Sequence, residues 1–488
     1  MIRVGSPHPT AARSFRALLA WGSALVTAAV VAAYSVQQST EGIAFALLVL
    51  VASIVFMRNR ETASTISFRW VPVAWVAMVF TADHHFFDLI RSPLEAAYGS
   101  ASPENIVQVA VFAMVGAMVL RSRRTLVQLA PSKIPKLPML LFPALALASV
   151  LWSPIKLFTA IRASQLLVIT ALSLLTVRVW HWSPRLGKSI WRDTLSLFVQ
   201  LATALVLVGF IVGWTGYRRF HWPGIEPGLA STWAGAALLI LLVGGKRFAP
   251  RPVWAYWARV AILATAVFLG ETRTVLAAIP FAGLVAVWTL GREKPIARYL
   301  GLWYYAVAAL LLVLLARLQL AAYLSRGESS QSLDSLSGRI PLWHSAIHDL
   351  DAAGKMYTGF GYGAARIVLY PQYSWAGTAH NSWIEALLGV GIVGVCFLAA
   401  AVMFLVWRLG WGSESNRFTR LALALLAFLL VVSLTSEIMA TPGIGFALLA
   451  WIFVPALGQW KRFPDVPIRP EGGSSVTTGG PAVARTVR

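Results

Sequence analysis

Charged residues are scarce in this chain, and long apolar runs take their place. Only 12% of its 488 residues are charged, against roughly 25% in globular domains, while 58% are hydrophobic. This composition excludes an ordinary water-soluble fold. The apolar runs are also unbroken, which excludes a transmembrane β-barrel, because barrel strands alternate apolar and polar residues. We therefore expect an all-α, polytopic transmembrane protein, since a helix satisfies its own backbone hydrogen bonds in lipid.

Cysteine and recognisable metal motifs are equally scarce. Cys396 is the single cysteine, so the chain has no intrachain disulfide. His344 and His348 are four residues apart but lack the glutamate of an HExxH zinc motif. The glycine-rich segment 358–363 follows no predicted strand, so we expect its glycines to let the loop backbone approach a sugar or Arg339 rather than bind a dinucleotide. The sequence predicts neither a metal nor a cofactor.

The apolar runs predict about 14 membrane spans, with about 12 as the lower bound. Several runs are shorter than the roughly 20 residues of a full span, so some enter the bilayer only partly. The predicted spans are Phe15–Val36, Gly42–Met57, Trp70–Thr81, Ile106–Leu120, Met139–Trp152, Ala163–Val179, Leu195–Trp214, Thr232–Val243, Val260–Leu269, Val275–Leu290, Leu302–Leu320, Ser382–Val406, Leu421–Ser436 and Gly443–Leu457.

One long polar segment interrupts this pattern and divides the chain. Residues 1–320 form the N-terminal group of transmembrane helices, and residues 321–381 form a large loop with short helices. Residues 382–460 form the C-terminal transmembrane helices. Residues 461–488, rich in glycine, serine and threonine, predict a disordered tail.

The basic residues predict the orientation of the spans. If the N-terminus is cytoplasmic, most of the 41 lysines and arginines fall in cytoplasmic segments, as the positive-inside rule requires. The large loop and the C-terminal tail then lie on opposite sides of the membrane, the tail in the cytoplasm. The net charge of +22 is spread over many short loops, which does not favour a nucleic-acid surface but is compatible with anionic membrane lipid.

A histidine stands where the large loop enters the next apolar run. His380 precedes Asn381 and Ser382, which are typical helix N-cap residues. An imidazole can accept a proton from a hydroxyl group at neutral pH. The alternative is a capping or packing histidine, but this cap needs no histidine. The position favours a general base at the membrane surface.

Four motifs in order carry a family resemblance. They are Glu271-Thr-Arg273-Thr274, Asp334-Ser-Leu-Ser-Gly-Arg339-Ile-Pro-Leu-Trp343, Thr358-Gly-Phe-Gly-Tyr-Gly363, and Ala379-His380-Asn381-Ser382 with Glu385. Together they resemble the O-antigen ligase and polymerase superfamily. The resemblance covers about residues 270–394, whereas the first half of the chain agrees mainly in topology.

The resemblance implies a GT-C-like membrane glycosyltransferase of the bacterial inner membrane with its active site in the periplasm. Its donor would be a glycan linked to undecaprenyl pyrophosphate, and its acceptor a hydroxyl group of another glycan or of lipid A-core. His380 and Arg273 match the family's catalytic histidine and helix-end arginine. Arg218, Arg219, Arg339, Trp343 and Asn381 are the candidate substrate-binding residues. A flippase and a chain-length regulator are the expected functional partners.

Arginine suits a lipid pyrophosphate leaving group, because it stays charged and can donate two parallel hydrogen bonds to phosphate. Arg273 lies in a very short turn between two apolar runs, where a charge is typical of a functional site. The alternative is an arginine that snorkels or pairs with Glu271. Arg218 and Arg219 either bind substrate or contact lipid headgroups. Stabilisation by arginine could replace a divalent cation, so a metal-independent transferase is expected.

Three functions remain open from the sequence. A polysaccharide repeat-unit polymerase is favoured, and an O-antigen ligase that acts on lipid A-core is the first alternative. A lipid-linked oligosaccharide flippase is the alternative from another class. A flippase predicts two related halves and short loops on both sides, and this chain shows neither.

Overall fold

The computed structural model describes residues 68–84, 103–129, 136–212, 219–248, 252–290, 299, 335–373, 376–411 and 416–459. The predicted spans Phe15–Val36, Gly42–Met57 and Leu302–Leu320, the C-terminal tail and Arg218 lie outside these residues. Within them the chain is helix and connecting segments, with no β-strand, which confirms the all-α prediction.

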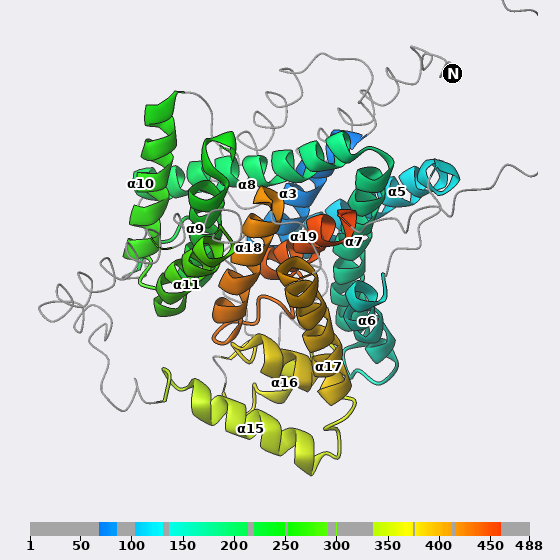
Figure 1. The fold of residues 1–488 in the computed structure, drawn as a ribbon. Coiled ribbons are helices and arrows are strands. Elements are labelled where there is room, and N and C mark those ends of the chain that lie inside the picture. The colour runs from blue at the N-terminus through cyan, green and yellow to red at the C-terminus, as the bar shows by residue number, and fades with distance from the viewer. Residues whose placement is uncertain are drawn as a thin grey trace, which may run out of the picture.

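The helices are labelled in Figure 1. The first group comprises α3 (Trp70–Asp83), α5 (Pro103–Leu129), α6 (Leu137–Ala148), the 3-10 turn η2 (Ser149–Leu151), α7 (Lys156–Trp182), α8 (Pro184–Val212), α9 (Pro227–Gly244), the 3-10 turn η3 (Gly245–Phe248), α10 (Val253–Leu269) and α11 (Arg273–Leu290). The second group comprises α15 (Arg339–Ala352), α16 (Ala365–Val368), α17 (Ser382–Gly410), α18 (Arg417–Ser433) and α19 (Ile444–Gly458).

Every predicted span that falls within the described ranges coincides with one of these helices. Four helices are long and apolar enough to cross a membrane: α7, α8, α9 with η3, and α17. Six shorter helices are also apolar. The number of spans stays a prediction. Several helices extend beyond the predicted spans, most of all α8, which begins at Pro184 rather than near Leu195, so the basic stretch 185–192 is helical.

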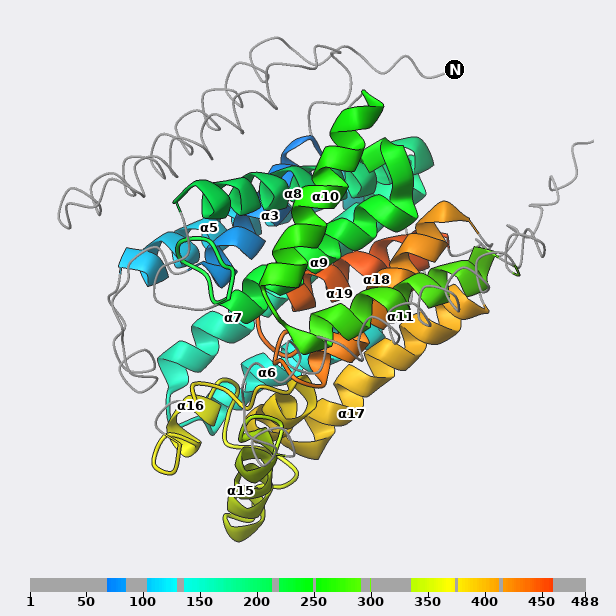
Figure 2. The same cartoon turned by 90° about the vertical axis from the view of Figure 1, so that its left-hand side faces the viewer.

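The centre of the bundle is α19. Almost all of its side chains are buried, and a helix that is apolar on every side is stable only when other helices surround it. It packs against α7, α18, α3, α8 and α17. Figure 2 shows it between the surrounding helices. Trp191 donates to the carbonyl of Trp451 over 3.1 Å, which ties α8 to this central helix.

The connecting segments lie at two ends of the bundle. They alternate between these ends in the order that the distribution of basic residues predicts. At one end, the indole N–H of Trp222 donates a hydrogen bond to the His84 ring. At the same end, the Asp83 carboxylate accepts hydrogen bonds from the Trp233 side chain and from the backbone N–H of Ile444. At the other end, His181 contacts the carbonyl of Leu457 and Arg408 donates to that of Gln459. Segments predicted on the same side of the membrane therefore meet. The contacts support the alternation of the helices and do not identify the cytoplasmic side.

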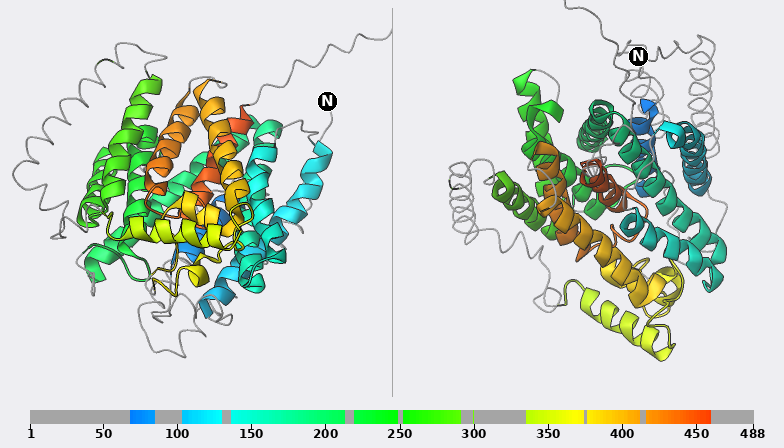
Figure 3. Two further views of the ribbon diagram at one scale, coloured as in Figure 1. Left: turned by 90° about the horizontal axis from the view of Figure 1, so that it is seen from below. Right: turned by 45° about the vertical axis from the view of Figure 1, so that its right-hand side comes forward.

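The first of these ends carries α15 and α16 and is called the site end below; the other is called the opposite end. Figure 1 shows α15 across this end, and Figure 3, left, views the same end from below. The small core of this region joins α15, α16 and the first turns of α17 through the buried residues Leu342, Ala346, Leu350, Ala365, Leu369, Ala376, Ala379 and Leu388.

The glycine-rich segment 358–363 packs against α17 and not against Arg339, while approach of this segment to a sugar stays a prediction. The backbone N–H groups of Phe360 and Gly361 donate to the carbonyls of Leu388 and Gly389, each over 2.8 Å. A side chain at Gly361 would collide with Ser153 at 2.4 Å. The two carbonyls belong to α17 and lie next to its kink at Val390–Gly391. A group that inserts into the hydrogen bonds of a helix is a known cause of such kinks.

Candidate active site

His380 lies at the site end, in the turn before α17. Its side chain is 29% exposed, so a substrate group can reach the ring. Its backbone φ of 49° is in the left-handed region, which few residues other than glycine adopt. Such a conformation persists only where the surrounding structure holds it. The predicted position of His380 at the loop–helix junction is confirmed.

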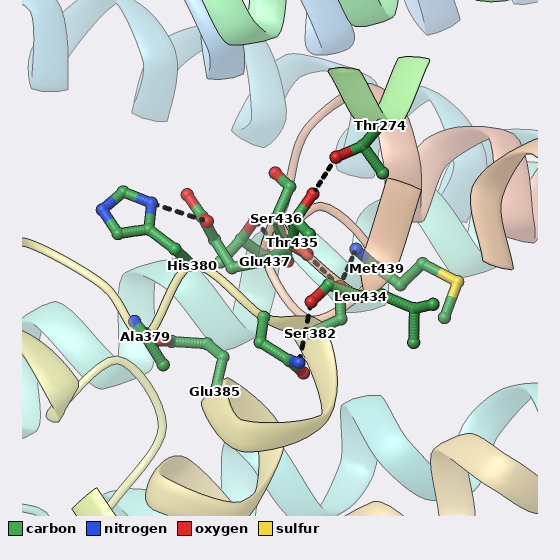
Figure 4. Close-up of polar contacts among 12 residues, drawn as sticks. Thr274, Ala379, His380, Ser382, Glu385, Leu434, Thr435, Ser436, Glu437 and Met439 are labelled. Carbon is green, nitrogen blue, oxygen red and sulfur yellow. Dashed lines mark hydrogen bonds and ion pairs between the residues drawn. The ribbon is translucent and has the colours of Figure 1, made fainter. Parts of the chain in front are cut away.

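The imidazole faces a carboxylate that the sequence did not single out. Glu437 Oε2 lies 3.7 Å from His380 Nδ1, beyond hydrogen-bond distance but within ion-pair distance (Figure 4). This oxygen is buried and has no hydrogen-bond partner among the residues described. The signal in the sequence was a lone glutamate in a short segment between two apolar runs, α18 and α19.

The α18–α19 connection is bound to the start of α17 by several hydrogen bonds (Figure 4). Ser382 Oγ donates to the carbonyl of Ser436 over 2.7 Å and accepts from the backbone N–H of Met439 over 3.0 Å. Asn381 Nδ2 donates to the carbonyl of Leu434 over 2.9 Å. These bonds fix the distance between the histidine and the segment that holds its carboxylate partner.

Asn381 caps α17, as predicted. Its side-chain oxygen accepts from the backbone N–H groups of Trp383 and Ile384. Both hydrogen-bonding groups of the Asn381 side chain are therefore engaged by the protein. Its role is structural in this geometry, and substrate binding by Asn381 stays a prediction.

The residue before the histidine is held from two sides. Trp343 Nε1 donates to the carbonyl of Ala379 over 2.8 Å, which fixes α15 against the active-site turn. The backbone N–H of Ala379 donates to Glu385 Oε2, also over 2.8 Å. The two bonds explain how the strained backbone of His380 is maintained although its side chain is partly exposed.

The predicted arginines approach this turn from separate elements. Arg339 is the first residue of α15 and lies one helical turn before Trp343, so both face the same side of that helix. Arg273 begins α11, where Thr274 Oγ1 is hydrogen-bonded to Thr435 Oγ1, two residues before Glu437 (Figure 4). The structure thus brings α11 and α15 to the active-site turn.

Arg219 lies at the same end of the bundle. The backbone N–H of Phe220 donates to the carbonyl of Leu269, which places Arg219 beside the end of α10 and the turn before Arg273. Contact of Arg219 with substrate stays a prediction.

Two further arginines at this end were not predicted from the sequence. Arg162 in α7 and Arg366 in α16 line a small cavity together with Glu385. Burial lowers the pKa of the Arg366 guanidinium, and neighbouring carboxylates, Glu385 first, oppose that shift. Burial also raises the pKa of Tyr362, whose hydroxyl donates to the carbonyl of Ala440. The only signal for Arg162 was a single cation near the outer end of an apolar run.

The fold and the site define a class of protein. The described chain is an apolar helical bundle of membrane-protein character, with a histidine–carboxylate pair and several arginines at one end. No group of three or more His, Cys, Asp or Glu side chains suited to a metal ion occurs in that part of the chain.

Comparison with known families agrees with this class. Residues 258–399 match the family model described as O-antigen ligase. The match confirms the predicted resemblance to the O-antigen ligase and polymerase superfamily and supports a membrane glycan-processing enzyme of that family. The matched segment includes Arg273, Arg339 and His380, whereas Arg162 and Glu437 lie outside it. No curated protein matches the chain.

Proposed function

We propose that the protein transfers a glycan from undecaprenyl pyrophosphate to a hydroxyl group of an acceptor glycan at the periplasmic face of the bacterial inner membrane. The observation that carries the proposal is the partly exposed His380, which faces Glu437 at the point where the arginine-bearing ends of α11 and α15 meet. His380 would provide the base, and the arginines would provide permanent positive charges close to the same turn.

The proposed reaction is a single displacement at the donor sugar. The acceptor hydroxyl loses its proton to His380 Nε2 as its oxygen bonds to the anomeric carbon of the donor. The bond from that carbon to the pyrophosphate oxygen breaks, and the lipid pyrophosphate leaves with the electron pair. Glu437 stabilises the imidazolium that forms, because it faces Nδ1 on the other side of the ring.

The leaving pyrophosphate needs compensation of its negative charge. Arg273 and Arg339 are the proposed groups, because a guanidinium can donate two parallel hydrogen bonds to phosphate oxygens. Arg218 and Arg219 are the further candidates for donor binding. Cations fixed in place before the reaction stabilise the charge that develops, which is the proposed basis for catalysis without a metal.

Within this class we propose a polysaccharide repeat-unit polymerase. The specific alternative is a ligase that transfers the glycan to lipid A-core, and the family description as O-antigen ligase favours it. The two reactions share the donor and the leaving group and differ in the acceptor. The residues that bind donor and leaving group would therefore serve either one.

The test is transfer from a purified undecaprenyl-pyrophosphate-linked glycan by the full chain in detergent. One arm offers the same repeat unit as acceptor and the other offers lipid A-core. We expect transfer in the first arm, and we expect His380→Ala to lower its rate by about 10²–10⁴-fold, the usual worth of general-base catalysis.

His344→Ala is the matched control, because His344 is an exposed histidine on α15, and it should retain wild-type activity. Transfer only to lipid A-core would convert the assignment to the ligase. Normal turnover by a well-expressed His380→Ala variant would remove the histidine from the mechanism. Passage of the intact lipid-linked glycan across vesicles, without transfer, would instead identify a flippase.

A further inference from the structure

The cavity between α7 and the large loop backs onto the active-site turn. Its walls include Phe158, Arg162, Arg366, Thr378, Glu385 and Thr441. Thr378 lies two residues before His380, and Thr441 lies four residues after Glu437. The segments that carry the histidine and its carboxylate partner therefore also wall this cavity, which is called the Arg162–Arg366 cavity below.

Two positively charged side chains line this cavity, and both lie near the same aromatic ring. The guanidinium carbons of Arg162 and Arg366 lie 5.9 Å and 5.4 Å from the centroid of the Phe158 ring. Arg162 comes from a long apolar helix and Arg366 from the large loop, so only the folded chain places them together. Both arginines are partly exposed, and like charges placed together stabilise a bound anion where solvent can still reach them.

Within its described part, the protein compensates the charge of Arg366 through space, by Glu385 first, and not through a direct ion pair. No carboxylate there lies within the 4.0 Å that defines an ion pair with either arginine. Among the same residues Arg366 has no hydrogen-bond partner, and Arg162 donates one bond of 3.3 Å to Gln165. A guanidinium carries five N–H donors, so most of the donors in this cavity are not used by the described part of the protein.

Two other polar groups complete the walls. Thr378 Oγ1 is buried and has no hydrogen-bond partner in the part of the chain that the structure describes. Glu385, 5% exposed, has one oxygen bonded to the backbone of Ala379. The cavity thus offers many donors for an oxyanion, and it has one carboxylate that can accept from a neighbouring hydroxyl group.

We propose that the Arg162–Arg366 cavity binds one anionic group of the glycan substrate, a carboxylate or a phosphate, through the two guanidinium groups. The proposal rests on the proposed function for the identity of the ligand as a glycan substrate. The group would come from an acidic sugar or from the donor pyrophosphate. Either one would anchor the substrate directly behind the turn that presents His380.

The experiment measures binding rather than turnover, so it is independent of the transfer reaction. The full chain in detergent is titrated by calorimetry, at constant ionic strength, with sodium glucuronate and with inorganic pyrophosphate. We expect at least one probe to bind the wild type. Arg162→Gln and Arg366→Gln should each weaken that binding about tenfold or more, since each removes charge-assisted hydrogen bonds.

Lys355→Gln is the matched control, because Lys355 is a cation of the same loop that lies over Phe360, 4.9 Å from the ring centroid, outside this cavity. It should bind as the wild type does, and so should His380→Ala. Arg366→Lys keeps the charge but lacks the planar fork, so it should weaken binding severalfold and serves if Arg366→Gln does not fold.

Tighter binding of glucuronate would assign the cavity to an acidic sugar, and tighter binding of pyrophosphate would assign it to the donor. Absence of binding by both probes would overturn the proposal. So would pyrophosphate binding that depends on Arg273 and not on Arg366, or an equal loss in Lys355→Gln. Binding with the expected dependence but without transferase activity would leave the cavity in place and refute the proposed function instead.

Discussion

The two ends of the helix bundle use the same residue types for different purposes. At the opposite end, Asn416 caps α18 and its amide nitrogen donates to Gln459 over 3.0 Å. At the site end, Asn381 caps α17 in the same way, and its amide nitrogen donates to the carbonyl of Leu434. The caps are equivalent, and the cap at the site end is preceded by His380, a residue with a strained backbone.

Among the described residues, backbone strain is found at the site end. Within the described ranges, the residues other than glycine with positive φ are Glu271, Leu336, Ser337 and His380, and all of them lie at the site end. Each precedes a helix start that presents a proposed functional residue: Arg273, Arg339 or the capped turn of α17. Strain of this kind costs free energy and concentrates where a site requires a particular geometry. The comparison therefore points to the site end without reference to sequence motifs.

The two ends should differ completely in accessibility from outside the cell membrane. Tyr357 at the site end is 70% exposed and Trp411 at the opposite end is 73% exposed. With Cys396→Ser as background, we expect a membrane-impermeant maleimide to label Tyr357→Cys in intact spheroplasts. Trp411→Cys should be labelled only after permeabilisation. The reverse pattern would refute the periplasmic site and the mechanism with it.

The largest catalytic contrast should come from arginines that begin helices at the two ends. Arg273→Ala should lose nearly all transfer, and Arg273→Lys most of it, because a point charge lacks the planar fork. Each charge-assisted hydrogen bond lost costs about 1.5–3 kcal/mol, or roughly tenfold or more in rate. Transfer rates in detergent, with and without EDTA, measure this.

Arg417→Ala is the control for Arg273, since Arg417 is the exposed first residue of α18. It should behave as the wild type. Full activity of Arg273→Ala would remove this arginine from the mechanism. Activity lost in EDTA and restored by a divalent cation would show that a metal is required.

A smaller effect is expected at the carboxylate beside the histidine. Glu437→Gln removes the charge that faces His380 Nδ1 and should lower kcat roughly 10- to 100-fold, with KM little changed. Steady-state kinetics distinguish this from a loss of substrate binding. Asp351→Asn, at an exposed aspartate of α15, should change neither constant. A rise in KM alone would contradict the orienting role.

The smallest expected change is in the two helix caps. Asn381→Ala and Asn416→Ala should each lower the free energy of unfolding by about 1 kcal/mol, the usual worth of an N-cap. Thermal unfolding in detergent measures this. Only Asn381→Ala should also reduce transfer, because it loosens the turn that carries His380. Equal activity of the two variants would show that the cap does not position the histidine.

Much of the site end was predictable from local sequence. The transition from the polar loop to an apolar run, with Asn381 as an N-cap, is enough to locate His380. The arginines Arg273 and Arg339 were found because each stands close to an apolar run or within a recognisable motif. Glu437, Arg162 and Arg366 were not found, because their partners are distant in the chain and a lone charge near an apolar run does not show which group it faces.

The glycines show the same limit. The number of glycines in segment 358–363 correctly predicted that the backbone of this segment lies very close to another part of the molecule. It did not predict that this part is α17. Gly391 has a φ of 71°, and an added side chain would lie 2.1 Å from the carbonyl oxygen of Tyr357. This close packing requires both a kink in α17 and a loop that inserts at the kink. No local sequence pattern predicts either feature.

The sequence by itself determined the helical membrane class, the positions of most helices and the histidine at the loop–helix junction. These depend on composition, on the length of apolar runs and on capping, which act between residues close in the chain. The tertiary structure alone decided that Glu437 faces His380 and that Arg162 and Arg366 share one cavity. Charges interact through space, so their partners are set by how the helices pack and not by their order in the sequence.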